Sequence, residues 1–199
     1  MNYKKFLSFF SVIFLFSSTV YSEVNMDRLT NAMSEPENWL THHKSLDGAR
    51  YVELNQINRF NVQNMKVAYT IPLGDIAEGS DGLGSHQSTP LVKDGFMYVT
   101  GLWDVVYKID LTGKYPSIVW TFDPENDVDV IGNPVTRGAA LWGNAVIINT
   151  EDGRVISIDD ETGEMNWESV IATELGEGFR AAPLVADGVI LVHNAFGDW

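Results

Sequence analysis

Residues 155–169 read VISIDDETGEMNWES, and residues 105–122 read VVYKIDLTGKYPSIVWTF. Both stretches pass from a short alternating apolar segment to an aspartate, then to a Thr-Gly pair, and then to a tryptophan. Alternation with a period of two residues is typical of β-strands, and a Thr-Gly pair between such segments is typical of a turn. The chain therefore repeats a unit of antiparallel strands that ends on a tryptophan-bearing strand.

The repeat extends along most of the sequence. Runs that predict strands occupy residues 66–73, 89–101, 104–110, 117–123, 137–150, 154–160, 165–171 and 181–194. Gly95, Gly143 and Gly188 lie in equivalent turns, separated by 48 and then 45 residues. A period of this length is typical of the four-stranded blades of a β-propeller. We predict an all-β fold of about two and a half blades, in which Trp120 and Trp167 pack against the neighbouring blade.

The N-terminal residues 1–22 predict a secretory signal peptide. Lys4 and Lys5 precede an apolar run, and Val20 and Ser22 stand before the expected cleavage site. The run is short for a membrane span, so we expect no stable membrane insertion after cleavage, with an uncleaved anchor as the alternative.

The rest of the chain divides into two regions. Residues 23–66 are polar, with short helical signals such as a single turn that Asn61 could cap before Met65. Residues 67–199 contain the propeller repeats.

The composition excludes several kinds of site. The chain has no cysteine, so it has no disulfide, no thiolate nucleophile and no c-type haem attachment motif. A net charge of −14 with only 13 Lys and Arg residues argues against nucleic-acid binding.

Three further segments carry a resemblance to a known family. Residues 37–74 read ENWLTHHKSLDGARYVELNQINRFNVQNMKVAYTIPLG, TRG stands at residues 136–138, and FGDW at residues 196–199. With the repeats, they resemble the quinoprotein alcohol dehydrogenases, whose eight-bladed propeller binds pyrroloquinoline quinone. The resemblance implies periplasmic oxidation of a small primary alcohol or a similar hydroxyl compound, with a periplasmic cytochrome c as electron acceptor.

The resemblance implies roles for four residues. Gln87 stands where the family commonly has a glutamate that reaches the quinone, and Arg137 matches an arginine that pairs with a quinone carboxylate. Arg180 replaces a small hydroxyl residue and would either reach a quinone carboxylate or fill the pocket. Asp198 stands where a glutamate binds the catalytic calcium or lanthanide ion. Taken alone, Gln87 and Asp198 could equally be turn residues, and Arg137 a partner in a salt bridge.

The same resemblance implies missing parts. The family often has adjacent cysteines near the positions of Ile131 and Gly132, and an asparagine and an aspartate of the metal site lie in later blades. Eight blades need on the order of 350 to 400 residues. We therefore expect the chain to be the N-terminal part of a longer enzyme and to be inactive alone.

Two alternatives remain open from the sequence. One is a non-enzymatic propeller scaffold like the lipoprotein that assists outer-membrane protein assembly, although such lipoproteins need a cysteine after the signal peptide. The other is a degenerate propeller without a cofactor, which Ile131, Gly132, Arg180 and Phe196 favour.

Overall fold

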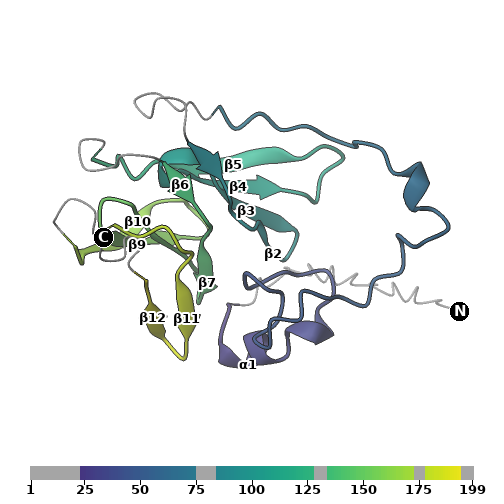
Figure 1. Cartoon of the computed structure of the whole chain (residues 1–199), viewed down its shortest axis with the longest axis horizontal. Helices are drawn as coiled ribbons and strands as arrows, with labels where there is room; N and C mark the ends of the chain where they lie inside the picture. Colours follow the sequence, from purple (N-terminus) through teal and green to yellow (C-terminus); the bar gives the residue numbers. More distant parts are fainter. Residues whose placement is uncertain (1–22, 75–83, 128–133, 173–177, 194–199) are drawn as a thin grey trace, which may run out of the picture.

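The computed structural model describes residues 23–74, 84–127, 134–172 and 178–193, and these form a mostly β structure (Figure 1). Blade 1 is a four-stranded antiparallel sheet in the order β2 (Leu91–Lys93), β3 (Phe96–Thr100), β4 (Val106–Asp110) and β5 (Ser117–Phe122). Blade 2 has the same order in β7 (Ala140–Trp142), β8 (Ala145–Asn149), β9 (Arg154–Asp159) and β10 (Met165–Val170). A hairpin of β11 (Leu184–Ala186) and β12 (Val189–Leu191) follows, so the predicted partial propeller is confirmed.

The repeated aspartate and Thr-Gly pair form turns with similar side-chain hydrogen bonds in both blades. Asp110 Oδ1 accepts hydrogen bonds from the backbone N–H and the hydroxyl of Thr112, at 2.7 and 2.6 Å. Asp159 Oδ1 accepts the same two bonds from Thr162, at 2.8 and 3.0 Å. A short acidic side chain that bonds the backbone just after it stabilises a turn, which explains why the sequence repeats this order.

The two tryptophan strands also share a local irregularity. Lys108 pairs with Trp120 and Ile109 with Ile118, so the register shifts just before the tryptophan of β5. The register of β10 shifts in the same way just before Trp167. A bulge at this point bends each outer strand and changes the direction of the following side chain.

Trp120 joins blade 1 to blade 2, as predicted. Its ring packs against the core, and its indole Nε1 donates to the backbone oxygen of Asp160 at 3.0 Å. Trp167 lies on the outer strand of blade 2 and is 43% exposed, so its docking role stays a prediction.

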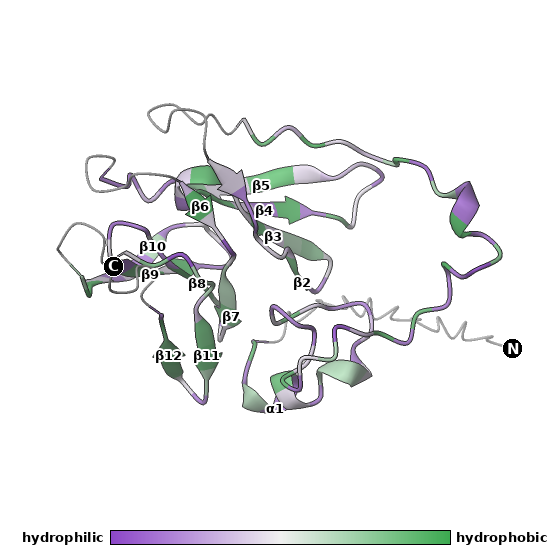
Figure 2. Ribbon diagram, in the orientation of Figure 1, coloured by the Kyte–Doolittle hydropathy of each residue, from purple (hydrophilic) through white to green (hydrophobic). Residues whose placement is uncertain are grey.

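The buried core combines strands of both blades with side chains of the N-terminal segment. Figure 2 shows the hydrophobic colouring along these strands. The buried members of this cluster are Val24, Leu29, Leu40, Leu91, Tyr98, Val106, Ala139, Leu141, Val146, Ile148, Ile156 and Ile158. The N-terminal segment is therefore packed onto the blades, although its division from them at residue 66 stays a prediction.

The N-terminal segment contains α1 (Met26–Thr30), η1 (Ala32–Ser34) and η2 (Val62–Asn64). Isolated bridges join it to both blades, between Val24 and Gly143 and between Trp39 and Val92. The Lys44 ammonium is fully buried and donates to the backbone oxygens of Ala32, Glu35 and Asn38 at 2.8, 2.7 and 2.6 Å.

Two local predictions were wrong. Residues 66–73 form no strand, and Val67 is 84% exposed. Strand-forming residues need a partner strand, and none of the described residues pairs with them. The predicted turn exists as η2, but the side chain of Asn61 bonds Asn58 N and Gln56 O instead of capping it.

Candidate functional site

A short parallel pair brings two of the predicted site residues together. β1 (Ser85–His86) pairs with β6 (Val135–Thr136), and Gln87 N donates to the oxygen of Thr136 at 3.1 Å. Gln87 and Arg137 directly follow these strands, so their side chains meet: Arg137 Nε donates to Gln87 Oε1 at 3.2 Å. Both residues are exposed, so a ligand can reach them.

The third predicted residue, Arg180, lies just before the β11–β12 hairpin. Its Nε is 3.2 Å from Glu151 Oε1, and its side chain is 21% exposed. Phe179 N donates to the oxygen of Thr150 at 3.1 Å, so the backbone before Arg180 is tied to the turn between β8 and β9.

Glu151 is a site residue that no sequence pattern indicated. It is only 5% exposed, and its Oε1 also accepts a hydrogen bond from Val135 N at 2.6 Å. Burial raises the pKa of this carboxyl, although the Val135 N–H and the charges of Arg180 and Arg137 oppose the rise. Since Glu151 stands beside Asp152 and Gly153 in a polar turn, its burial has no signal in the sequence.

A second buried carboxyl, Asp104, lies beneath this turn. Its Oδ2 accepts from Glu151 N at 3.1 Å and from Asn126 Nδ2 at 2.9 Å. Burial raises the pKa of Asp104 to about 7; the two hydrogen bonds oppose this rise, and the charges of Glu151 and Asp152 add to it. Asp104 ends the short helix η3 (Leu102–Asp104), which contacts β6.

The remaining predicted positions lie outside the described residues. These are the signal peptide at 1–22, the positions of Ile131, Gly132 and Phe196, and the proposed metal ligand Asp198. Within the ranges that the structure describes, no group of three His, Asp or Glu side chains could hold a metal ion.

The residues that are described fit an anionic group with several oxygens. The Arg137 guanidinium contacts the Gln87 carboxamide, and Arg180 pairs with Glu151, a carboxyl whose pKa the charge of Arg137 also lowers. Guanidinium forks match the geometry of carboxylates, and the carboxamide can donate or accept a hydrogen bond. The set therefore fits the carboxylates of pyrroloquinoline quinone, although its cofactor role stays a prediction.

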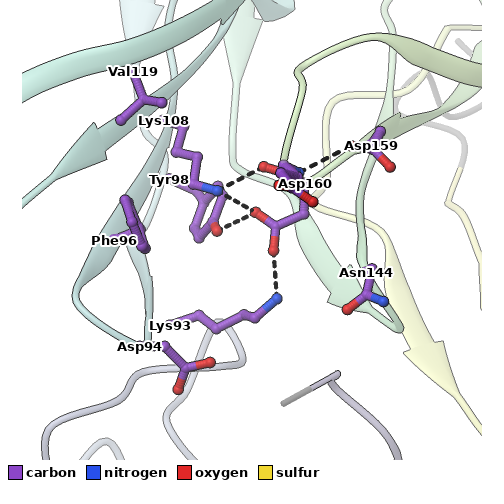
Figure 3. Close-up of a pocket in the computed structure, with 10 residues that line it drawn as sticks. Lys93, Asp94, Phe96, Tyr98, Lys108, Val119, Asn144, Asp159 and Asp160 are labelled. Carbon is purple, nitrogen blue, oxygen red and sulfur yellow. Dashed lines mark hydrogen bonds and ion pairs between the residues drawn. The ribbon is translucent and has the colours of Figure 1, made fainter. Parts of the chain in front are cut away.

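A separate polar cluster lies between the blades, beside a cavity of about 510 Å³ (Figure 3). The carboxylate of Asp160 bonds Lys93, Tyr98 and Lys108, the last at 3.0 Å. Burial alone would raise the pKa of Asp160, but these partners outweigh it and hold the pKa below its usual value. The Lys108 ammonium also lies 4.4 Å from the centre of the Phe96 ring. Because Asp160, which follows β9 of blade 2, bonds three side chains from strands of blade 1, we interpret this cluster as a connection between the blades.

Comparison with known proteins gives consistent relatives. Residues 39–169 match the PQQ family described as glucose/ethanol/alcohol dehydrogenase, beta-propeller domain. The dehydrogenase subunit of the quinone alcohol dehydrogenase from Gluconacetobacter polyoxogenes is 33% identical, over 87% of this chain and 24% of its own length. A 1-butanol dehydrogenase (cytochrome c) from Thauera butanivorans is 32% identical, over 85% of this chain and 24% of its own length.

A solved europium-containing methanol dehydrogenase matches the structure with a TM-score of 0.73 and 31% identity, over 83% of this chain and 29% of that one. The chain thus spans about a quarter of the length of these two curated relatives. The family match covers most of the chain and includes both four-stranded blades. The chain therefore belongs to the PQQ family of glucose, ethanol and alcohol dehydrogenase β-propellers.

Proposed function

We propose that this chain is part of a pyrroloquinoline quinone-dependent dehydrogenase that oxidises a primary alcohol or a similar hydroxyl compound. The observation that carries the proposal is the convergence of Gln87, Arg137 and Arg180. They come from three successive units of a fold whose relatives are named as quinone alcohol dehydrogenases.

Each of these side chains has a role that its chemistry supports. Arg137 and Arg180 would bind carboxylate oxygens of the quinone, and Gln87 a further oxygen while it holds the Arg137 side chain. The bound quinone would supply the hydride acceptor for alcohol oxidation. The three side chains would hold and orient it.

The metal, the electron acceptor and the location are further parts of the proposal. Asp198 would be one ligand of a calcium or lanthanide ion, since hard cations prefer carboxylate oxygen. The europium-containing relative supports a lanthanide, and the cytochrome c named for the butanol dehydrogenase supports a periplasmic cytochrome as acceptor. Residues 1–22 would direct the chain to the periplasm. In the described part of the chain, no helix is both long and apolar enough to cross a membrane.

The test is a titration of the full-length polypeptide that contains this segment. We expect stoichiometric binding of pyrroloquinoline quinone and, with calcium or a lanthanide present, dye-linked oxidation of short primary alcohols above a heat-treated control. A folded protein that binds no quinone would contradict the proposal and favour the degenerate propeller.

A further inference from the structure

The carboxylate of Glu151 is buried, although the turn in which it lies does not need it. The turn between β8 and β9 forms through other bonds, because Gly153 N donates to the oxygen of Thr150 at 3.1 Å and Thr150 N to the oxygen of Arg154 at 2.9 Å. Yet the Glu151 carboxylate is buried, and its Oε2 has no hydrogen-bond partner among the residues that the structure describes. A buried, half-satisfied carboxylate destabilises a fold, so its presence calls for another role.

The other oxygen of this carboxylate joins two parts of the candidate site. Oε1 accepts from Val135 N, two residues before Arg137, and lies 3.2 Å from Arg180 Nε. The backbone of the third unit is also pressed onto this turn, because a Cβ at Gly178 would lie 1.6 Å from the oxygen of Glu151. The backbone beside Arg180 is thus fixed, and its long side chain pairs with the Glu151 carboxylate.

A hydrogen bond to Asp104 holds the backbone of Glu151 in place. Asp104 Oδ2 accepts the Glu151 N–H, and Asn126 binds the same oxygen. The carboxylate therefore starts from a fixed backbone, as a side chain that orients a ligand-binding group must.

We propose that Glu151 is a positioning residue of the quinone site, which directs the Arg180 side chain and holds β6, and with it Arg137, for the carboxylates of the cofactor. This inference rests on the proposed function. It assigns to Glu151 no contact with the quinone itself.

Whether quinone affinity falls or rises when the Glu151 charge is removed distinguishes a positioning role from simple charge repulsion. A negative charge near an anionic ligand opposes binding, so removing that charge would by itself tighten the complex. Glu151→Gln keeps an oxygen for the Val135 N–H but loses the ion pair with Arg180. If Glu151 acts by positioning, this variant binds the quinone more weakly.

The experiment titrates pyrroloquinoline quinone into the metal-free, full-length polypeptide and follows tryptophan fluorescence. We expect the dissociation constant of Glu151→Gln to rise about fivefold or more, a coupling of ordinary size for residues in contact. In an Arg180→Gln background the same change should alter the constant less than about twofold, because the side chain to be positioned is gone. Glu168→Gln is the matched control, since Glu168 also pairs with an arginine, Arg154, but is 43% exposed.

The outcomes are distinct. Quinone binding by the unmodified protein together with unchanged or tighter binding by folded Glu151→Gln would overturn this inference alone. No binding by the unmodified protein would overturn the proposed function and this inference with it. If Glu151→Gln does not fold, Arg180→Lys serves instead: a lysine keeps the charge but lacks the guanidinium fork. We then expect the same weakening, and unchanged affinity would overturn the inference.

Discussion

At the scale of single residues, the candidate site depends on how its charges are balanced. Arg180 pairs with the buried carboxylate of Glu151, the charge of Arg137 also lowers the pKa of that carboxyl, and the neighbouring carboxyl of Asp104 has a pKa of about 7. Exposed charges gain little from such contacts, whereas buried ones strongly affect stability and binding. We therefore predict an effect on quinone binding for the exposed Arg137 and an effect on stability for the buried Asp104.

Arg137→Ala should weaken quinone binding by about 2 kcal/mol without unfolding the protein, because it removes a hydrogen bond between charged groups. Arg59→Ala is the control. Arg59 belongs to the N-terminal segment, where its guanidinium lies over the Phe60 ring, and it is not among the predicted quinone-binding residues. Calorimetric titration with the quinone measures both. Equal affinities for the two variants would remove Arg137 from the site.

Asp104 should make stability depend on pH. Its folded pKa of about 7 lies above the ordinary 3.8, so the folded state holds the proton more tightly than the unfolded state. Stability should therefore fall as the pH rises from about 4 to 7, by up to about 4 kcal/mol for this group. Asp104→Asn should lose this dependence and gain stability relative to the unmodified protein at pH 8.

Thermal unfolding of both proteins between pH 5 and pH 8 checks the Asp104 prediction. A constant difference in midpoint across this range would mean that Asp104 does not titrate there.

At the scale of elements, the tryptophan of blade 1, Trp120, packs against the Thr-Gly turn of blade 2. A Cβ at Gly163 would lie 2.7 Å from the Trp120 ring. The glycine therefore satisfies two conditions at once, a φ of +76° and the close approach of an aromatic ring.

Gly163→Ala should destabilise the protein by about 3 kcal/mol, from backbone strain and displacement of the indole. Gly188 is a matched control because it has the same φ of +76°, but apart from its chain neighbours no atom of the described residues lies within 4 Å of an added Cβ. Gly188→Ala should therefore cost only about 1 kcal/mol. Denaturant unfolding measures the difference. Equal costs would show that the Trp120 contact does not constrain this turn.

At the scale of the whole molecule, the described residues form two four-stranded sheets, the β11–β12 hairpin and the short β1–β6 pair (Figure 1). All six residues of β10 are exposed, among them Met165, Trp167 and Val170, and so are Leu184, Val189 and Leu191 of the following hairpin. Apolar side chains on an outer strand favour pairing with other chains.

The polypeptide 23–199 expressed alone should therefore self-associate, bind no quinone at micromolar concentration and oxidise no alcohol. In the proposed enzyme the quinone would be bound by preorganised groups from several blades, and a shorter polypeptide that offers fewer of them would pay more ordering free energy on binding. Light scattering after gel filtration, with a quinone titration, tests this prediction. Val170→Lys should reduce the association by placing a charge on the outer strand, and a monomer that binds quinone stoichiometrically would contradict the prediction.

The sequence predicted those features that depend on near neighbours. The Asp110 and Asp159 turns form between residues two or three positions apart, so the repeated pattern located the turns, the strands and the family. The contact between Gln87 and Arg137 was not visible in it, because the parallel pair β1–β6 joins residues 50 positions apart.

The tertiary structure alone decided which strand signals find a partner and which charges are buried. Residues 66–73 have strand-forming side chains, but no strand among the described residues pairs with them. No sequence pattern distinguishes Glu151 or Asp104, and their burial and raised pKa values arise only where distant segments meet. Hydrogen bonds within a turn are fixed by local geometry, whereas desolvation depends on every distant segment that excludes water from the group.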